Sequence, residues 1–276
     1  MIKRATELCI LCKTSERELL IEKDSWKVYR CPGCGLGFLD PRHSESEIEQ
    51  LYRSEYFSER YDEGIDPDSA RYKKRLSRET HRTKFIKHVK CSGRLLDIGC
   101  GYGYFLDACR RQGYDVQGLD VSKWAAGYAI QKLGISVTVG KINDVSFPLH
   151  HFDIITMWHS LEHTPDPHLA LRKARSWLKP DGILVIDVPN YEGTNAQKIW
   201  QEWDGWSLPY HYWHFTFKSL TLLLQKHDFK IMKSKNYHSD FVKEKLRRIP
   251  VVSLFARLIA KMYSGTSVAV ISKVEN

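Results

Sequence analysis

From Arg94 onward, short apolar runs alternate with longer segments in which apolar residues recur every three or four positions. The short runs predict strands at 94–98, 116–120, 135–139, 152–158 and 183–188, and the segments between them predict helices at 104–112, 123–133 and 168–178. A helix at 220–227 and strands at 229–235 and 267–273 follow. Because strands that alternate with helices form parallel sheets covered on both faces, the pattern predicts a doubly wound α/β fold.

The chain ahead of this region carries two C-x2-C pairs, Cys9 with Cys12 and Cys31 with Cys34. This spacing lets two short turns close a tetrahedral thiolate site, with a short strand around Val28 between them. A redox dithiol is the alternative, but no strand–helix unit surrounds either pair. The spacing therefore predicts a small zinc ribbon with a structural Zn2+ ion.

The segment between ribbon and sheet begins polar and acidic, with a candidate helix at 45–52, and continues as a basic amphipathic helix at 70–89. We therefore predict three parts: the ribbon at 1–40, a linker with N-terminal helices at 41–90, and the α/β domain at 91–276.

The composition of the chain bears on its class, its charged surfaces and its cellular location. The 276 residues are 42% hydrophobic, which suits a globular chain, and the formal net charge is +9. Basic residues concentrate at 71–90 and 243–261, as on solvated helix faces or on surfaces that bind nucleic acid or anionic lipid. The first residues do not resemble a signal peptide, no apolar run could span a bilayer, and four of seven cysteines fit a metal pattern. These features predict a cytoplasmic location.

The strand at 94–98 runs into Gly99, Gly101 and Gly103, which permit a sharp turn and close backbone approach to a ligand. The spacing is G-x-G-x-G, whereas dinucleotide sites use G-x-G-x-x-G. Asp97 precedes the turn. A carboxylate at this position would attract the cationic amino group of S-adenosylmethionine, whereas it would repel a diphosphate. Asp120 ends the next strand, where it could accept ribose hydroxyls or cap the following helix.

Five ordered segments, LLDIGCGYGYFL, GLDVS, FDIITMWHSLEHTPDP, LKPDGILVIDVPN and HYWHFTFKSL, together with the ribbon, resemble class I S-adenosylmethionine-dependent methyltransferases. The nearest relatives act on sugars, natural products or quinone precursors. The resemblance implies a Rossmann-like, doubly wound, seven-stranded sheet with an antiparallel last strand. It also implies a cofactor site at Asp97, Gly99, Cys100, Gly101, Gly103, Asp120, Val121, Asn143, Asp144 and Trp158. Lys141 departs from the acidic residue that many relatives carry near adenine.

The fourth predicted strand delivers His159, Glu162 and His163 to the same sheet edge. A histidine titrates near neutral pH and could remove the proton of an acceptor hydroxyl, and His214 is a further candidate. Glu162 and His163 could instead bind a divalent metal, as in some quinone-pathway O-methyltransferases that this motif resembles. The aromatic segment from Asn190 to His214, which includes His211, could form a lid over a pocket or pack as an ordinary loop on the sheet.

Residues 240–263 combine regularly spaced apolar side chains with basic ones, interrupted by Pro250. This segment could contact a membrane peripherally, pack beside the pocket, or contact a second subunit. The oligomeric state is not predicted.

The leading functional prediction is methyl transfer from S-adenosylmethionine to a small-molecule acceptor, such as a hydroxyl of a sugar or natural product. An RNA methyltransferase is the alternative from the same class, because a ribbon and a basic helix also suit nucleic acid. A non-catalytic binding protein that keeps the fold is the alternative from another class.

Overall fold

The computed structural model describes residues 8–42, 47 and 64–275. The chain divides into two compact units. Unit 1 contains Met1–Ser44, Leu161–Pro167 and Asp187–Val270, and unit 2 contains Glu45–Ser160, His168–Ile186 and Ile271–Asn276. The candidate helix at 45–52 and most of the acidic segment around it lie outside the described residues. The part boundaries near residues 40 and 90 stay predictions.

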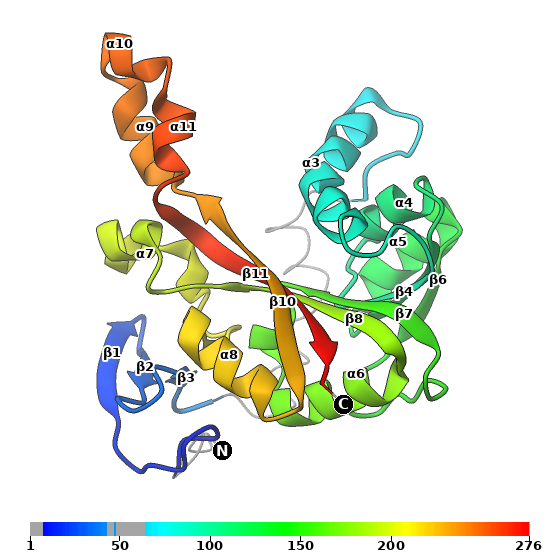
Figure 1. Cartoon of the computed structure of the whole chain (residues 1–276), viewed down its shortest axis with the longest axis horizontal. Coiled ribbons are helices and arrows are strands. Elements are labelled where there is room, and N and C mark those ends of the chain that lie inside the picture. The colour runs from blue at the N-terminus through cyan, green and yellow to red at the C-terminus, as the bar shows by residue number, and fades with distance from the viewer. Residues whose placement is uncertain (1–7, 43–46, 48–63, 276) are drawn as a thin grey trace. The chain divides into compact units, whose positions relative to one another are not determined.

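A mixed seven-stranded sheet has the order β10-β11-β8-β7-β4-β5-β6 (Figure 1). Its strands are β4 (Arg94–Ile98), β5 (Asp115–Asp120), β6 (Ser136–Val139), β7 (Phe152–Trp158), β8 (Leu178–Pro189), β10 (Phe229–His238) and β11 (Ser264–Val274). Strand β4 pairs in parallel with β5 and β7, and β5 pairs in parallel with β6. The fold class predicted from the sequence is confirmed.

The last strand runs opposite to β8. The Asn190 N–H donates to the Thr266 carbonyl, and the Ser272 hydroxyl donates to the Leu184 carbonyl. Residue numbers therefore rise along one strand as they fall along the other, so the two strands are antiparallel. Strand β8 begins at Leu178, ahead of the Pro180-Asp181-Gly182 break, and not at residue 183 as the sequence pattern predicted. The Lys179 ammonium bonds the Asp153 carboxylate at 2.8 Å, which fixes this early, extended start of the strand.

The helices of unit 2 are α3 (Ala70–Lys87), α4 (Tyr104–Arg110), α5 (Lys123–Leu133) and α6 (Pro167–Trp177), the last of which begins at the unit boundary. Helix α3 is basic, but its one acidic residue, Glu79, is buried between the guanidiniums of Arg75 and Arg82. The apolar side chains of β4 and β7 are fully buried, as expected for strands covered on both faces.

Unit 1 contains a second, four-stranded sheet in the order β1-β2-β3-β9. Its strands are β1 (Glu18–Lys23), β2 (Trp26–Arg30), β3 (Gly37–Leu39) and β9 (Trp213–His214), so a distant segment completes the ribbon sheet. The remaining elements are the 3-10 turns η1 (Leu161–His163), η2 (Trp200–Glu202) and η3 (Asp204–Trp206), and helices α7 (Thr194–Lys198), α8 (Phe217–Gln225), α9 (Asp240–Arg247), α10 (Pro250–Ser253) and α11 (Ala256–Ala260).

Most rings of the aromatic segment are core residues of unit 1. Tyr191, Trp203, Trp206, Tyr212 and Trp213 are all buried. Trp206 contacts Tyr191 and Trp203 through its ring, at centroid distances of 6.1 and 5.1 Å. Because all five rings are buried, they do not present a free aromatic surface as a lid would.

Across the described ranges, no helix has both the length and the apolar character needed to cross a lipid bilayer.

Candidate functional site

The turn after β4 is built on three glycines with left-handed backbone. Gly99, Gly101 and Gly103 have φ values of 80°, 51° and 75°. Residues with a Cβ atom rarely adopt these values, so the alternating glycines are a conformational requirement of the turn. Gly103 then caps the N-terminus of α4. The turn therefore lies at the carboxyl end of β4, where ligands bind in such sheets.

The space around the three glycines differs. A Cβ atom on Gly99 would lie 2.6 Å from the Ser160 Oγ atom, and one on Gly103 would lie 3.0 Å from the Ala129 Cβ atom. A Cβ atom on Gly101 would meet no atom of the described residues within 4 Å. The middle of the turn therefore faces open space, so a ligand can approach the Gly101 backbone closely.

Asp120 ends β5 beside this turn. Its Oδ2 atom accepts the Gly101 N–H at 2.7 Å, and its Oδ1 atom accepts the Ser122 N–H at 2.8 Å. Burial raises the pKa of the Asp120 carboxyl, although these backbone donors oppose that shift. Ser122, and not Asp120, caps helix α5. Each carboxylate oxygen keeps a second lone pair, so the group can still accept hydroxyl donors.

Asp97 lies within β4, next to β7. Burial raises the pKa of its carboxyl to about 7, although the Thr156 hydroxyl, which donates to Oδ1 at 2.6 Å, lowers it. A group with this pKa is partly neutral at physiological pH. A cation placed beside it would favour the ionised form, so this position suits a positively charged ligand group.

The other predicted cofactor residues lie around the same edge of unit 2. Cys100 is buried within the turn, whereas Val121 is exposed directly after β5. Asn143 and Asp144 lie in an exposed turn after β6, where the Asn143 carbonyl accepts the Lys173 ammonium at 2.7 Å. Trp158 ends β7 and is buried.

The Trp158 side chain faces α3 through a cation–π contact. The Arg82 guanidinium lies 5.0 Å from its ring centroid. The indole Nε1 atom has no hydrogen-bond acceptor among the residues that the structure describes. A buried donor without an acceptor is costly, so this N–H is available to a ligand atom.

The four predicted catalytic residues fall in different units. His159 follows β7 in unit 2, with φ of 52°, a left-handed conformation that is uncommon for a non-glycine residue and costs free energy. Because β7 pairs with β4, His159 lies at the sheet edge that carries the glycine turn. Glu162, His163 and His214 belong to unit 1.

Glu162 and His163 lie close to His211, which the sequence pattern had assigned only to the aromatic segment. One ligand atom from each of Glu162, His163 and His211 lies within 4.8 Å of the others. The Nδ1 atoms of the two histidines donate to the carbonyls of Tyr210 and Gly205, at 3.1 and 3.0 Å. This tautomer carries the proton on Nδ1 of each ring, so each Nε2 atom is an acceptor of the kind that ligates metals.

His214 differs from the other three candidates. It is buried in unit 1, and burial lowers the pKa of its imidazole to about 3. A base this weak removes protons poorly at neutral pH. His214 is therefore the weakest candidate for a general base.

The four ribbon cysteines converge in unit 1. The Sγ atoms of Cys9 and Cys34 lie 3.5 Å apart, and those of Cys12 and Cys31 lie 3.2 Å apart. All four lie within 4.8 Å of one another. Both pairs form the same turn, in which the residue four positions after the first cysteine, Lys13 or Gly35, donates its N–H back and has positive φ. The chain thus provides two matching metal-binding turns.

Sequence reasoning missed three of the residues that shape these sites. Thr156 bonds Asp97, and its only signal was a hydroxyl within the apolar run FDIITMW. Arg82 covers Trp158, but it resembled the other basic residues of its helix. His211 was noted as one of several aromatic residues and not as a partner of Glu162.

Comparisons with known proteins agree with this geometry. The profile of a family described as a methyltransferase domain matches residues 68–234. Ubiquinone biosynthesis O-methyltransferases from Haemophilus ducreyi and Paraburkholderia phymatum are 31% and 34% identical over 108 and 117 residues, which cover 35% and 40% of this chain. The matches span 45% and 50% of those proteins, so the chain spans about half the length of the curated relatives it matches.

Solved structures share the fold. An S-adenosylmethionine-dependent methyltransferase from Mesorhizobium loti superimposes with a TM-score of 0.53 at 17% identity, over 70% of this chain and 96% of that one. Another from Archaeoglobus fulgidus gives a TM-score of 0.54 at 21% identity, over 72% of this chain and 94% of that one.

Proposed function

Since this chain belongs to the methyltransferase domain family, we propose that it transfers a methyl group from S-adenosylmethionine to a hydroxyl oxygen of a small-molecule acceptor. The observation that carries the proposal is the open space in front of Gly101, bordered by the Asp120 carboxylate. In this site the Gly99–Gly103 turn holds the methionine part, and Asp120 accepts the two ribose hydroxyls.

The charge of the turn favours this ligand over a dinucleotide. Asp97 and Asp120 are both buried at the ends of adjacent strands. A diphosphate would add negative charge beside two acidic groups, whereas the ammonium and sulfonium groups of S-adenosylmethionine would be attracted to them. The G-x-G-x-G spacing points to the same ligand.

When bound, S-adenosylmethionine supplies an electrophilic methyl group. The protein's task is then to align the acceptor oxygen with that methyl and to accept one proton. His159 is our candidate for the base, because it follows β7 at the edge that carries the turn and its imidazole can accept a proton. We expect His159→Gln to keep S-adenosylmethionine affinity while it lowers kcat.

The names of the relatives bear on the acceptor class. The relatives are named as O-methyltransferases of ubiquinone biosynthesis, which favours oxygen as the methylated atom. A hydroxyl of a sugar or natural product would react in the same way. A transfer assay should therefore offer both dihydroxylated aromatic rings and sugars as acceptors. An RNA acceptor and a non-catalytic role are the alternatives.

Two measurements test the proposal in order. Calorimetry with S-adenosylmethionine comes first, and an absence of binding would remove both the small-molecule and the RNA reaction. Transfer of a tritiated methyl group to metabolite fractions or to total RNA then separates these two. If the protein binds the donor but no acceptor fraction gains label, a non-catalytic role is favoured.

For the four ribbon cysteines we propose a structural Zn2+ ion. Four thiolates suit zinc, and a tetrahedral site with Zn–S bonds of about 2.3 Å needs sulfurs about 3.8 Å apart. The sulfur separations of 3.2 and 3.5 Å are slightly shorter than that, and small movements of the two turns would accommodate the ion. Such a site has no open position, so it holds the β1–β3 sheet together and leaves catalysis to other residues.

Glu162, His163 and His211 support a second, separate proposal. Two imidazoles and one carboxylate suit a divalent transition metal, and the Nε2 lone pairs of both histidines are directed by their Nδ1 bonds. Elemental analysis distinguishes this site from the ribbon. We expect His211→Ala to lose one metal equivalent and to keep the ribbon zinc, and an unchanged metal content would contradict the proposal.

A further inference from the structure

Residues 240–263 form a helical arm between β10 and β11. It consists of α9, α10 and α11, which in Figure 1 lie together at one end of the two strands. The whole arm and the part of the sheet to which it connects belong to unit 1. Its sequence contains six lysine or arginine residues and two acidic ones, so its net charge is +4.

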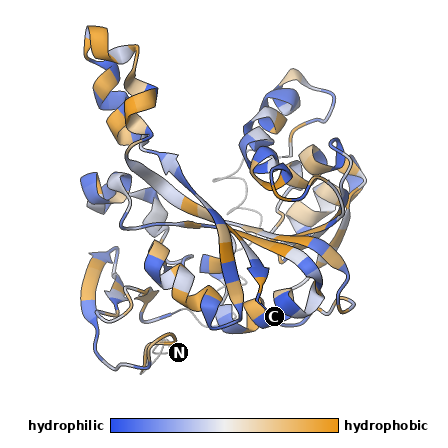
Figure 2. Cartoon of the chain, in the orientation of Figure 1, coloured by the Kyte–Doolittle hydropathy of each residue, from blue (hydrophilic) through white to orange (hydrophobic). Residues whose placement is uncertain are grey.

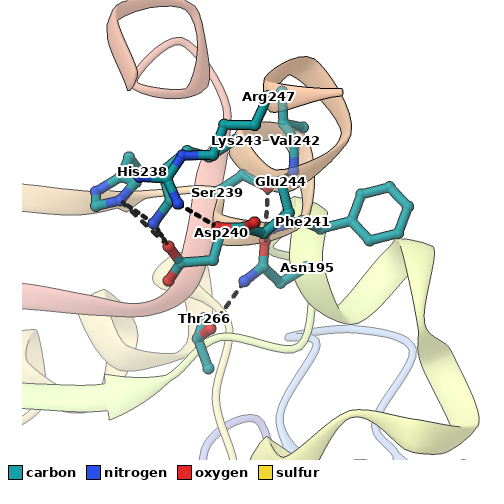
Figure 3. Close-up of polar contacts among 10 residues, drawn as sticks. All are labelled: Asn195, His238, Ser239, Asp240, Phe241, Val242, Lys243, Glu244, Arg247 and Thr266. Carbon is teal, nitrogen blue, oxygen red and sulfur yellow. Dashed lines mark hydrogen bonds and ion pairs between the residues drawn. The ribbon is translucent and has the colours of Figure 1, made fainter. Parts of the chain in front are cut away.

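The base of the arm is held by a buried polar network (Figure 3). The Ser239 hydroxyl donates to Asn195 Oδ1 at 2.6 Å, and the Asn195 amide donates to the Thr266 hydroxyl at 3.0 Å. The Ser239 N–H closes the arm by donating to the carbonyls of Ala260 and Tyr263. Ser239 is fully buried and Asn195 is nearly so. The arm therefore leaves the sheet in a defined direction.

The helices of the arm also pack on one another through small residues. Ala256 and Ala260 of α11 are buried, which lets α11 approach α9 closely. The hydroxyl of Ser239 caps α9 by accepting the Val242 N–H at 3.1 Å. The arm is thus a packed helical element. Its exposed side chains therefore lie on the surface of a folded structure.

That surface is unusually apolar. Val251, Leu254, Leu258 and Met262 are 74%, 82%, 65% and 82% exposed. Figure 2 shows hydrophobic and hydrophilic residues alternating along the three helices of the arm. Single exposed apolar residues are common, but a group of four on one small element marks an interaction surface.

The charges of the arm are also unbalanced. The carboxylate of Asp240 is paired with Lys243, and that of Glu244 is paired with Arg247 at 3.0 Å. The remaining basic side chains have no carboxylate partner among the described residues. These are Lys245, Arg248, Arg257 and Lys261. Exposed cations therefore lie in the same helices as the exposed apolar side chains.

We propose that this arm docks onto the surface of an anionic lipid bilayer. An interfacial segment buries apolar side chains among the acyl chains while its basic residues meet the headgroups, and the arm supplies both. A second copy of this chain is a poorer occupant, because a two-fold contact would place the arm's positive charge against itself. Nucleic acid would satisfy the cations but would leave the four aliphatic side chains exposed.

Cosedimentation of the full chain with vesicles tests the proposal without any methyl transfer. We expect binding to vesicles of phosphatidylcholine with phosphatidylglycerol, weaker binding to phosphatidylcholine alone, and loss of binding as NaCl approaches about 0.5 M. Leu254→Asp with Leu258→Asp should lower the partition coefficient at least tenfold. Arg257→Gln with Lys261→Gln should lower it about 25-fold, at about fivefold per cation.

The matched control is Leu149→Asp, because Leu149 is an equally exposed leucine (69%) in unit 2. It should bind vesicles like the unchanged protein, and circular dichroism should show all variants folded. The proposal fails if the unchanged chain binds neither vesicle, or if the arm and control variants bind equally. A dimer in light scattering that Leu254→Asp dissociates, with no vesicle binding, would overturn it in favour of a second copy.

Discussion

Replacing Gly101 by alanine tests the cofactor site at its centre. Gly101 has φ of 51°, and an added Cβ atom would meet no atom within 4 Å in the described part of the chain. The protein alone should therefore lose only the cost of a left-handed alanine, about 1–2 kcal/mol, or a Tm lower by about 2–8 °C. The methyl group would, however, occupy the space proposed for S-adenosylmethionine. Overpacking of about 1–3 kcal/mol there predicts a Kd about 5- to 150-fold higher.

Gly113→Ala is the matched control for this change. Gly113 also has positive φ, 90°, and open space around its Cβ position, but it follows α4 and lies outside the turn. We expect a similar fall in Tm and an unchanged Kd in calorimetry. If Gly101→Ala binds S-adenosylmethionine as tightly as the control, the ligand does not lie against Gly101 and the proposed site is wrong. If both variants lost the same affinity for S-adenosylmethionine, the loss would reflect lower stability and not a contact at Gly101.

Three further predictions address charge, metal and packing. Because the raised pKa of Asp97 is about 7, its ionised form becomes populated as pH rises through 7, so S-adenosylmethionine should bind about tenfold more tightly at pH 8 than at pH 6. Calorimetry that shows a flat Kd over this range, or the same slope in Asp97→Asn, would contradict this role. Cys12→Ser should abolish ribbon zinc in elemental analysis, whereas Cys91→Ser, at another exposed cysteine, should leave it unchanged. Glu79→Gln should cost about 3 kcal/mol in urea unfolding, because it leaves two guanidiniums near a buried site without their carboxylate, and a cost below about 1 kcal/mol would refute that account.

The sheet was the part of the fold that the sequence predicted best. Runs such as 94–98 and 152–158 are apolar throughout because both faces of their strands are covered, and the glycines after β4 fix where the turn must lie. The early start of β8 was missed, because Pro180 and Gly182 normally end regular structure. Strand β9 is two residues long and has no period to detect, so its addition to the ribbon sheet was also missed.

The site was only partly predictable, for a related reason. Asp97, Gly101 and Asp120 were found because backbone conformation and strand ends constrain them locally. Their partners depend on contacts between distant segments. Thr156 reaches Asp97 only through the pairing of β7 with β4, and His211 reaches Glu162 across about 50 residues of chain. The aromatic segment had the composition of a lid, but most of its rings are buried in the core of unit 1.

The electrostatics of unit 2 support our proposal that this turn binds a cationic ligand. Two buried carboxylates at adjacent strand ends are costly, and the raised pKa values of both record that cost. Asp120 offsets part of it by accepting two backbone N–H groups, whereas Asp97 has the Thr156 hydroxyl and a pKa near neutrality. A ligand with positive charge on its amino-acid end would relieve the remaining cost, and a neutral or anionic ligand would not. In the proposed site, discrimination by charge would therefore come before any contact to the adenine ring, so the departure at Lys141 does not remove the argument for S-adenosylmethionine.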